Sequence, residues 1–398
     1  MSRIKGHMLQ VAMFVINNFT NDARVHREAA TLADSGYRVT VIALKDGNTP
    51  AEETVDNFYV RRINLLTRSL PRVPGFQIFK YLEFIICSVF LAVRIRADIC
   101  HGHDLNALVP AFVAARVLKA YLIYDTHELA TGQNTQRRRI WGEMSLWHYM
   151  ERWLIKRVHL VLTVSPGIAD ELAGMYGIDR PQVIMNCPPY ENVTRNNLLR
   201  EFFNFNKKDV IVIYHGVFGP NRGIEVLVES FVHIPKGYKL VLMGPDNSFK
   251  GFIKNTVRNL NLLDRVFFHP AVPVKDVVKY VASADVGTFL SNPQIKSQQL
   301  GLPNKLFECM AAGTPIVVGT ICRELVLQLG VGVACDQNSP VSLAEAIQRL
   351  TTDSNLYHRV QQSAREYARS EYNWQAQGRK LRALYEMLQH ESRRPGIS

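Results

Sequence analysis

The sequence predicts an α/β protein made of two doubly wound domains, each with a parallel sheet that helices cover on both faces. Short apolar, strand-like runs alternate with helical patterns along almost the whole chain. A proline-containing break near residue 188 divides this alternation into two sets, and 398 residues are enough for each set to bury its own core. Two such domains imply a cleft between them.

The first set opens with a βαβ unit: a strand over 9–16, a helix over 23–34 and a strand over 38–44. Gly36 stops the helix, and the second strand is apolar on both faces, which is typical of a parallel sheet covered on both sides. Further strands are expected over 58–64, 99–101, 121–124, 160–164 and 183–185, and further helices over 78–94, 105–118, 147–156 and 166–175.

Two consecutive prolines, Pro188 and Pro189, prevent a helix or a sheet ladder from continuing, so we place the domain boundary at residue 190. The second set begins after them, and residues 363–390 form a last, strongly helical and charged stretch. The strands of the second set are expected over 210–215, 238–243, 266–269, 286–290 and 315–318, and its helices over 223–232, 251–260, 274–282, 304–312 and 343–350.

A single carboxylate is predicted to lie on an apolar helix of the second domain. Residues 304–312 form a helix with an apolar stripe, Gly313 ends it, and a core strand follows. Glu308 lies within this apolar surround. An ionised carboxylate there is costly unless it accepts hydrogen bonds, and paired hydroxyls of a ligand can donate them. The alternative is that Glu308 is an ordinary acidic residue of this helix and binds no ligand.

Ligands of open parallel sheets bind at the carboxyl ends of strands, so the turns that follow strands are the expected sites of chemistry. Residues 216–223 form a glycine-rich turn with Arg222 at the mouth of a helix, which predicts an anion site, although a plain βα loop explains the pattern equally well. Gly244 follows the next strand and allows a ligand to approach the backbone closely.

In the first domain, His127 and Glu128 place an imidazole beside a carboxylate after the strand over 121–124. His127 can donate a hydrogen bond to a substrate oxygen or phosphate, and the alternative is a surface histidine beside a capping acid. His101, His103 and Asp104 are spaced like metal ligands, but with no fourth ligand nearby we expect no metal site.

The composition excludes some classes of protein. Six cysteines lie far apart without CxxC spacing, which favours reduced thiols, and the N-terminus lacks a signal-peptide pattern, so we expect a cytoplasmic protein. The net charge is +12, and residues 61–96 carry many basic residues beside one acid, Glu83. The apolar run 84–93 inside this region is shorter than the ~20 residues that span a bilayer, and a buried helix is the alternative to a membrane span.

Residues 137–157 combine aromatic and basic side chains, as helices at a membrane interface do. Contact with the inner face of an anionic membrane is therefore one expectation for this basic surface. A solvated basic helix face is an equally good alternative. Nucleic acid is a third possible partner of this basic surface. We expect no nucleic-acid partner, because the chain contains no recognition helix, zinc spacing or aromatic RNA motif.

Several segments taken together resemble a known enzyme family. Their order and spacing along nearly the whole chain resemble the family 4 retaining glycosyltransferases of GT-B architecture, in which two Rossmann-like domains face each other across a cleft. Trp374 and the helix after it resemble the closing helix of that family, which crosses back onto the first domain. The matching segments are 21–29, 124–128, 216–223, 283–286 and 304–315.

The resemblance implies a metal-independent, hexosyltransferase-type enzyme that transfers a sugar from a UDP- or GDP-sugar to a glycan or lipid-linked acceptor in polysaccharide or glycoconjugate biosynthesis. The nucleotide-sugar is a substrate, and no cofactor is implied. Residues 1–190 would form the acceptor-binding domain, residues 191–370 the donor-binding domain, and residues 371–398 the helix that packs back on the first domain.

The resemblance also implies roles for individual residues. Glu308 would bind ribose hydroxyls, Arg222 and Lys305 would neutralise the pyrophosphate, and His127 would lie against the transferred sugar or its phosphate. The implied catalytic residues are His127, Arg222 and Glu308. The implied donor-binding residues are Gly216, Arg222, Gly244, Ala271, Val272, Asn304, Lys305 and Glu308. The implied acceptor-side residues are Asn18, Arg24, His103, Asp104 and Glu128.

The chain also departs from the family pattern. Leu300 stands where a second glutamate is usual, so we expect Gln298, Gln299 or backbone amides to bind the sugar instead. Val217 stands where a basic residue is usual, which leaves Arg222 as the main cation of that turn. Two alternatives remain at this stage: a nucleotide-sugar 2-epimerase of the same architecture, and a scaffold that has lost catalysis.

Overall fold

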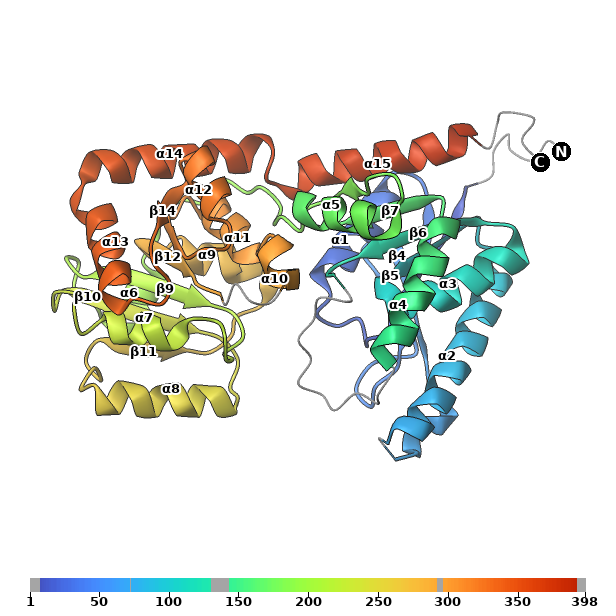
Figure 1. Ribbon diagram of the computed structural model, residues 1–398, viewed down its shortest axis with the longest axis horizontal. Helices are drawn as coiled ribbons and strands as arrows, with labels where there is room; N and C mark the ends of the chain where they lie inside the picture. Colours follow the sequence, from blue (N-terminus) through green and yellow to red (C-terminus); the bar gives the residue numbers. More distant parts are fainter. Residues whose placement is uncertain (1–7, 72, 130–142, 292–295, 392–398) are drawn as a thin grey trace. The chain divides into compact units, whose positions relative to one another are not determined.

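The computed structural model describes residues 8–71, 73–129, 143–291 and 296–391. The chain forms two compact units. The first unit consists of Met1–Met185 together with Gly378–Ser398, and the second consists of Asn186–Gln377. Each unit is an α/β layer structure with a mainly parallel sheet between helices (Figure 1). The predicted fold class of two parallel-sheet α/β domains is therefore confirmed.

The sheet of the first unit has the order β3-β4-β2-β1-β5-β6-β7-β8. All of its strand pairs are parallel except β3 with β4. The strands are β1 (Gln10–Phe14), β2 (Arg38–Leu44), β3 (Glu52–Val55), β4 (Phe58–Ile63), β5 (Ile99–His103), β6 (Tyr121–Thr126), β7 (Leu160–Thr163) and β8 (Gln182–Val183). The helices are α1 (Ala23–Asp34), α2 (Pro74–Ile95), α3 (Asp104–Leu118), α4 (Glu143–Leu154) and α5 (Pro166–Tyr176), with short 3₁₀ turns at Leu66–Ser69 and Ile155–Arg157.

The sheet of the second unit is parallel throughout and has the order β11-β10-β9-β12-β13-β14. Its strands are β9 (Val210–His215), β10 (Tyr238–Met243), β11 (Val266–His269), β12 (Val286–Phe289), β13 (Ile316–Val318) and β14 (Gly332–Ala334). Its helices are α6 (Leu198–Phe203), α7 (Ile224–Ser230), α8 (Ser248–Asn259), α9 (Val277–Val281), α10 (Lys296–Leu300), α11 (Asn304–Ala312), α12 (Arg323–Leu329), α13 (Pro340–Thr352) and α14 (Ser354–Ser370), and a 3₁₀ turn covers Val274–Asp276.

The C-terminal stretch that the sequence presents as one helix is two helices, α14 and α15 (Trp374–Glu391). Asn373 separates them, because its side-chain oxygen accepts a hydrogen bond from the backbone N–H of Ala376 at 2.8 Å and thereby caps α15. The residues of α15 from Gly378 onward belong to the first unit, where Tyr385 is fully buried and hydrogen-bonded to Nδ1 of His101 at 2.8 Å.

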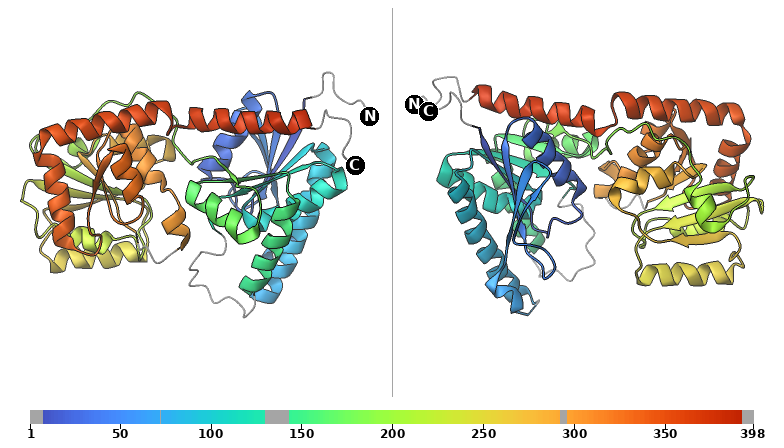
Figure 2. Two further views of the ribbon diagram at one scale, coloured as in Figure 1. Left: turned by 45° about the horizontal axis from the view of Figure 1, so that its top comes forward. Right: turned by 180° about the vertical axis from the view of Figure 1, so that it is seen from behind.

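Both sheets reverse their strand order once, between β1 and β5 in the first unit and between β9 and β12 in the second. The helices that follow the strands on either side of such a switch point lie on opposite faces of the sheet, which opens a crevice at the carboxyl ends of the strands. Figure 2 shows helices on both faces of each sheet. Candidate residues are therefore expected at the ends of β1 and β5 and at the ends of β9 and β12, and β6 is the next strand beyond β5.

Candidate functional site

In the second unit, the predicted site residue Glu308 is hydrogen-bonded to His215, which was not predicted from the sequence. His215 is the last residue of β9, and its Nε2 lies 2.8 Å from Oε2 of Glu308 on α11. The imidazole is buried, whereas the side chain of Glu308 is 18% exposed. The apolar residues beside Glu308 on α11 are buried as expected, but the carboxylate lies on the open side of the helix and is not enclosed. A buried imidazole therefore holds a carboxylate that a ligand can reach.

Lys305, one turn before Glu308, lies against the turn after β9. Its Nζ is 4.5 Å from the centroid of the Tyr214 ring and 3.5 Å from the hydroxyl of Tyr214. Gly216 has φ +118°, and a Cβ atom there would come within 3.1 Å of the Lys305 ammonium. A side chain at Gly216 would crowd the ammonium and strain the backbone, so the positive φ favours glycine at this turn.

Lys305 and Arg222 are two cations in one region of the second unit. Burial, and after it the positive charge of Arg222, lowers the pKa of Lys305 to about 8, while Glu308 opposes this shift. A partly desolvated ammonium next to a guanidinium is unfavourable on its own and becomes favourable when an anion with two negative charges binds. The geometry and charge at this point therefore suit a diphosphate.

This arrangement makes the affinity for a diphosphate depend on pH. Lys305 is charged below pH 8 and loses its proton as the pH rises through 8, whereas a bound anion stabilises the ammonium. We expect the affinity for a nucleoside diphosphate to be nearly constant between pH 6 and pH 7.5 and to fall above pH 8. Calorimetric titrations at five pH values measure this, and an affinity that rises above pH 8 contradicts the assignment.

The other predicted donor-side residues occupy loops of the same unit. Ala271 and Val272 follow β11, and Asn304 is exposed at the first turn of α11. Packing alone explains Gly244, because a Cβ there would lie 2.2 Å from the carbonyl oxygen of Gly216. Arg222 lies in the turn between β9 and α7, near Lys305 and Tyr214.

The residues expected to replace the missing glutamate are on α10. Leu300 ends this helix and is half-buried. Gln298 accepts a hydrogen bond from the hydroxyl of Ser291 at 2.6 Å, and Gln299 is exposed. The side-chain oxygen of Gln298 therefore already has a partner within the protein.

In the first unit, His127 lies just after β6 at the centre of a charged network. Its Nε2 is 3.2 Å from Oδ2 of Asp125, and its Nδ1 is 3.6 Å from Oδ2 of Asp104. Its backbone N–H donates to Oδ1 of Asp104 at 3.1 Å. Burial lowers the pKa of His127, but the charges of Asp104 and Asp125 outweigh this effect and raise the pKa to about 9. His127 is consequently an imidazolium at neutral pH.

Arg24 and His103 lie behind His127 and are buried. Arg24 holds Asp125 with two hydrogen bonds, Nε to Oδ2 at 2.9 Å and Nη2 to Oδ1 at 2.8 Å. Its Nη1 donates to the backbone carbonyl of Ile184 at 2.5 Å. His103 lies opposite Asp125 in the sheet register, with Nδ1 3.3 Å from Oδ2. Arg24 and His103 were predicted on the acceptor side, and both side chains are almost inaccessible to solvent.

The remaining acceptor-side residues are nearer the surface. Glu128 is exposed, and Asp104 is half exposed with φ 64° at the start of α3. Asn18 shapes the loop after β1, since its side-chain amide donates to Asp46 at 2.6 Å and its side-chain oxygen accepts from the hydroxyl of Thr20 at 2.8 Å.

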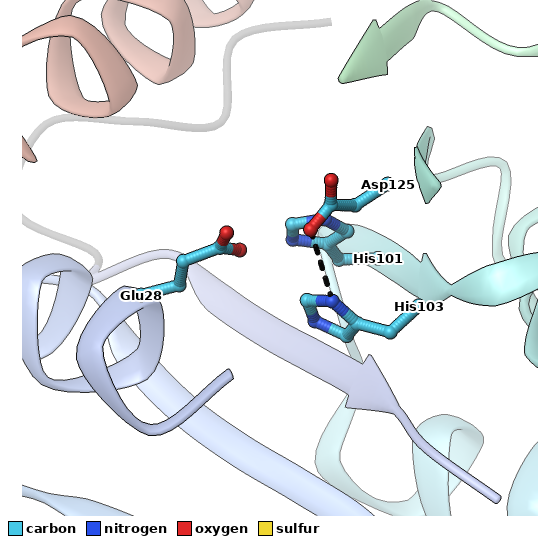
Figure 3. Close-up of side chains that lie close together, drawn as sticks. All are labelled: Glu28, His101, His103 and Asp125. Carbon is cyan, nitrogen blue, oxygen red and sulfur yellow. Dashed lines mark ion pairs between the residues drawn. The ribbon is translucent and has the colours of Figure 1, made fainter. Parts of the chain in front are cut away.

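Figure 3 shows the buried cluster of Glu28, His101, His103 and Asp125, with the Glu28 carboxylate pointing toward the two imidazoles. Their ligand atoms lie within 4.8 Å of one another, so by spacing they can hold a metal ion. However, the guanidinium of Arg24 is hydrogen-bonded to Asp125 and has its Nε 3.1 Å from Oε1 of Glu28. Arg24 supplies the cation that Asp125 needs, while burial and the charge of Asp125 raise the pKa of Glu28 to about 8. The cluster therefore fits an internal network better than a metal site.

The fold of the chain is the GT-B fold, which solved glycosyltransferase structures share. A sucrose-phosphate synthase from Thermosynechococcus elongatus superposes with a TM-score of 0.81 and 20% identity over 96% of this chain and 100% of that one. The Anabaena protein HepE, solved with UDP-glucose, superposes with a TM-score of 0.74 and 16% identity over 96% of this chain and 100% of that one.

Sequence comparison then gives the family. The family model for glycosyl transferases group 1 matches residues 196–367, and the glycosyl transferase 4-like domain matches residues 22–188. A D-inositol 3-phosphate glycosyltransferase of Xylanimonas cellulosilytica is 25% identical over 322 residues, 75% of this chain and 73% of that protein. A glycogen synthase of Mycobacterium tuberculosis is 21% identical over 311 residues, 75% of this chain and 71% of that protein. The chain belongs to the GT4-type glycosyltransferases, as its motifs predict.

Proposed function

We propose that this glycosyltransferase transfers a hexose from a UDP- or GDP-sugar to a glycan or lipid-linked acceptor, with retention of anomeric configuration. The observation that carries the proposal is the pair of cations, Lys305 and Arg222, beside the His215–Glu308 hydrogen bond in the second unit. This set matches a nucleoside diphosphate, since the cations suit its phosphates and the carboxylate accepts from its ribose hydroxyls. HepE, a structural relative, was solved with UDP-glucose, which supports this choice of donor.

In the proposed reaction the bond between the anomeric carbon and the diphosphate oxygen breaks while the acceptor oxygen bonds to the same face of that carbon. The acceptor proton passes to the departing diphosphate oxygen. Negative charge grows on the diphosphate as it leaves, and Lys305 and Arg222 stabilise this charge more strongly in the transition state than in the bound donor. His127, as an imidazolium, contributes a further positive charge next to the sugar or its phosphate.

The proposal is tested by incubating the protein with a panel of UDP- and GDP-sugars, each with and without glycan and lipid-linked acceptors, followed by linkage analysis of the product. A glycosidic product that keeps the anomeric configuration of one donor supports the proposal. Conversion of a donor into its 2-epimer without an acceptor contradicts it in favour of the epimerase. The absence of binding to every donor contradicts it in favour of a scaffold.

We further propose that the first unit binds an anionic membrane surface through α2 and α4. A row of large apolar side chains on α2 faces solvent at helical spacing, and α4 adds three more. No helix among the described residues is both long and apolar enough to cross a membrane. The exposed apolar residues of α2 are Phe76, Ile78, Phe79, Leu82, Ile86, Phe90 and Val93, and those of α4 are Leu146, Tyr149 and Trp153.

An aromatic contact joins the two helices, and a basic side chain lies beside the apolar residues of α4. Tyr81 of α2 packs edge-on against Trp147 of α4, with ring centroids 5.9 Å apart. The guanidinium of Arg157 lies 3.8 Å from the centre of the Trp153 ring. Apolar side chains beside basic ones are the pattern of a helix that lies in the headgroup region of an anionic membrane. The predicted basic and aromatic residues Arg137–Trp141 lie outside the described residues.

Co-sedimentation with vesicles tests this surface. We expect the protein to sediment with vesicles that contain anionic lipid at low salt, and a double substitution of Ile86→Glu and Phe90→Glu to weaken binding at least ~10-fold, since burying each side chain contributes about 1.5–3 kcal/mol. The matched control is Leu327→Glu, which adds a charge at an exposed apolar residue of α12. Equal sedimentation of the double variant and the wild type contradicts the proposal.

A further inference from the structure

The two nitrogens of the His127 ring face carboxylates of different exposure. Nε2 faces Asp125, which is fully buried on β6, and Nδ1 faces Asp104, whose side chain is half exposed. The His127 side chain itself is 20% exposed. The ring therefore reaches from the interior of the first unit to its surface, with Nδ1 on the surface side.

Asp125 is unusually well fixed for a carboxylate. Arg24 binds both of its oxygens in a bidentate pair, and Arg24 is itself held by the backbone carbonyl of Ile184 and by Glu28 one turn further along α1. Burial raises the pKa of Asp125, but Arg24 and His127 outweigh it and hold that pKa well below its usual range. Asp125 is thus a rigid, permanently ionised acceptor.

We propose that Asp125, clamped by Arg24, is a positioning residue that fixes the imidazole of His127 with Nδ1 toward the surface, where it meets the substrate of the proposed transferase. The inference rests on the proposed function for what His127 touches, and on the geometry of the first unit for how His127 is held. Nothing in the motif pattern assigns this role, because the sequence singles out His127 and leaves Asp125 as part of a strand end.

The charged groups that face His127 decide how it responds to pH. Asp125 and Asp104 favour the imidazolium, and Arg24 and the neighbouring His103 disfavour it. With Asp125 in place His127 stays protonated up to about pH 9, and it loses its charge as the pH rises through that value. Removal of the Asp125 charge takes away one of the carboxylates that favour the imidazolium and therefore lowers the pKa of His127.

The first test is an NMR titration of His127, assigned with a His127→Asn variant, in the wild-type chain and in Asp125→Asn. We expect His127 to titrate near pH 9 in the wild type and at a clearly lower pH in Asp125→Asn. The measurement requires no transferase activity, so its outcome is separate from that of the proposed function. A wild-type His127 that titrates at or below its ordinary pKa overturns the proposal, whether or not the variant folds.

The second test is kinetic and uses the donor found by the panel. We expect Asp125→Asn to lower kcat about 100-fold at pH 8 with little change in the KM for the donor, since a misplaced catalytic group costs about this much. The variant should regain activity relative to the wild type as the pH falls below the lowered pKa of its His127. A loss that is the same at every pH indicates a merely structural role and overturns the proposal.

Two further variants complete the design. Arg24→Lys keeps the charge but cannot form the bidentate pair, so it should lower kcat while His127 remains protonated at neutral pH. Asp56→Asn is the matched control, because Asp56 lies 3.3 Å from His26 in an exposed aspartate–histidine pair of the same unit. It should change neither kcat nor the titration of His127. If Arg24→Lys has the kcat of the wild type, the proposed role of the Arg24–Asp125 pair is contradicted.

Discussion

Replacement of Lys305 by glutamine is expected to lower kcat by about 10²- to 10³-fold, the usual effect of removing one group that stabilises charge developing in a transition state. Lys305 is half-buried, its ammonium lies over the Tyr214 ring, and Arg222 is the only other cation that bears on it in the described residues. Glutamine retains a donor of similar length but no charge. The measurement is the initial rate of sugar transfer at saturating donor.

The same variant has a stability signature that separates it from a folding defect. Because burial and Arg222 destabilise the charged form of Lys305 in the folded protein, a neutral side chain should leave the melting temperature unchanged or raise it. Lys254→Gln is the matched control, since Lys254 also places its ammonium over an aromatic ring, 5.5 Å from the centre of Phe268, but on an exposed part of α8. A stable Lys305→Gln enzyme with the wild-type rate contradicts the assignment.

Replacement of Glu308 by alanine is expected to weaken binding of the nucleoside diphosphate about 10- to 100-fold and to reduce sugar transfer to below about 1%. Hydrogen bonds to a charged group contribute about 1.5–3 kcal/mol each, and 1.4 kcal/mol is a factor of ten in affinity. The variant also leaves the buried Nε2 of His215 without its acceptor. Isothermal titration and product analysis measure the two effects.

Two controls accompany this variant. Glu345→Ala removes an exposed glutamate from α13 in the same unit and should leave affinity and rate unchanged. The corresponding 2′,3′-dideoxy nucleoside diphosphate lacks the ribose hydroxyls, so the wild type should bind it as weakly as Glu308→Ala does. If Glu308→Ala still binds the nucleoside diphosphate as much more tightly than the dideoxy analogue as the wild type does, another group binds the ribose hydroxyls.

Most of the fold follows from the sequence because strand and helix periodicities are strong in buried elements. The bounds of α1, β2, β9, β10, β11 and α11 are those expected, and each of these elements is largely apolar on its covered face. The strand β3 was not predicted, because its residues Glu52–Val55 form an edge strand with partly exposed, polar side chains. The strand β14 has three residues, too few to show a period.

The candidate site was harder to read from the sequence, because several of its parts come from residues far apart in the chain. Glu308, Lys305 and His127 follow from motif positions, whereas the partners His215 and Asp125 do not. His215 is 93 residues from Glu308, and Arg24 is 101 residues from Asp125, so only the sheet order brings them together. The available signal was position, since both His215 and Asp125 lie at the carboxyl ends of parallel strands.

The measurement that tests the central claim most directly is calorimetric titration of the wild type and Lys305→Gln with UDP and GDP at pH 7. The account predicts that one of the two diphosphates binds the wild type in a 1:1 ratio and binds Lys305→Gln at least about 10-fold more weakly. No heat with either diphosphate, or equal affinity of the two proteins for the one that binds, would contradict it.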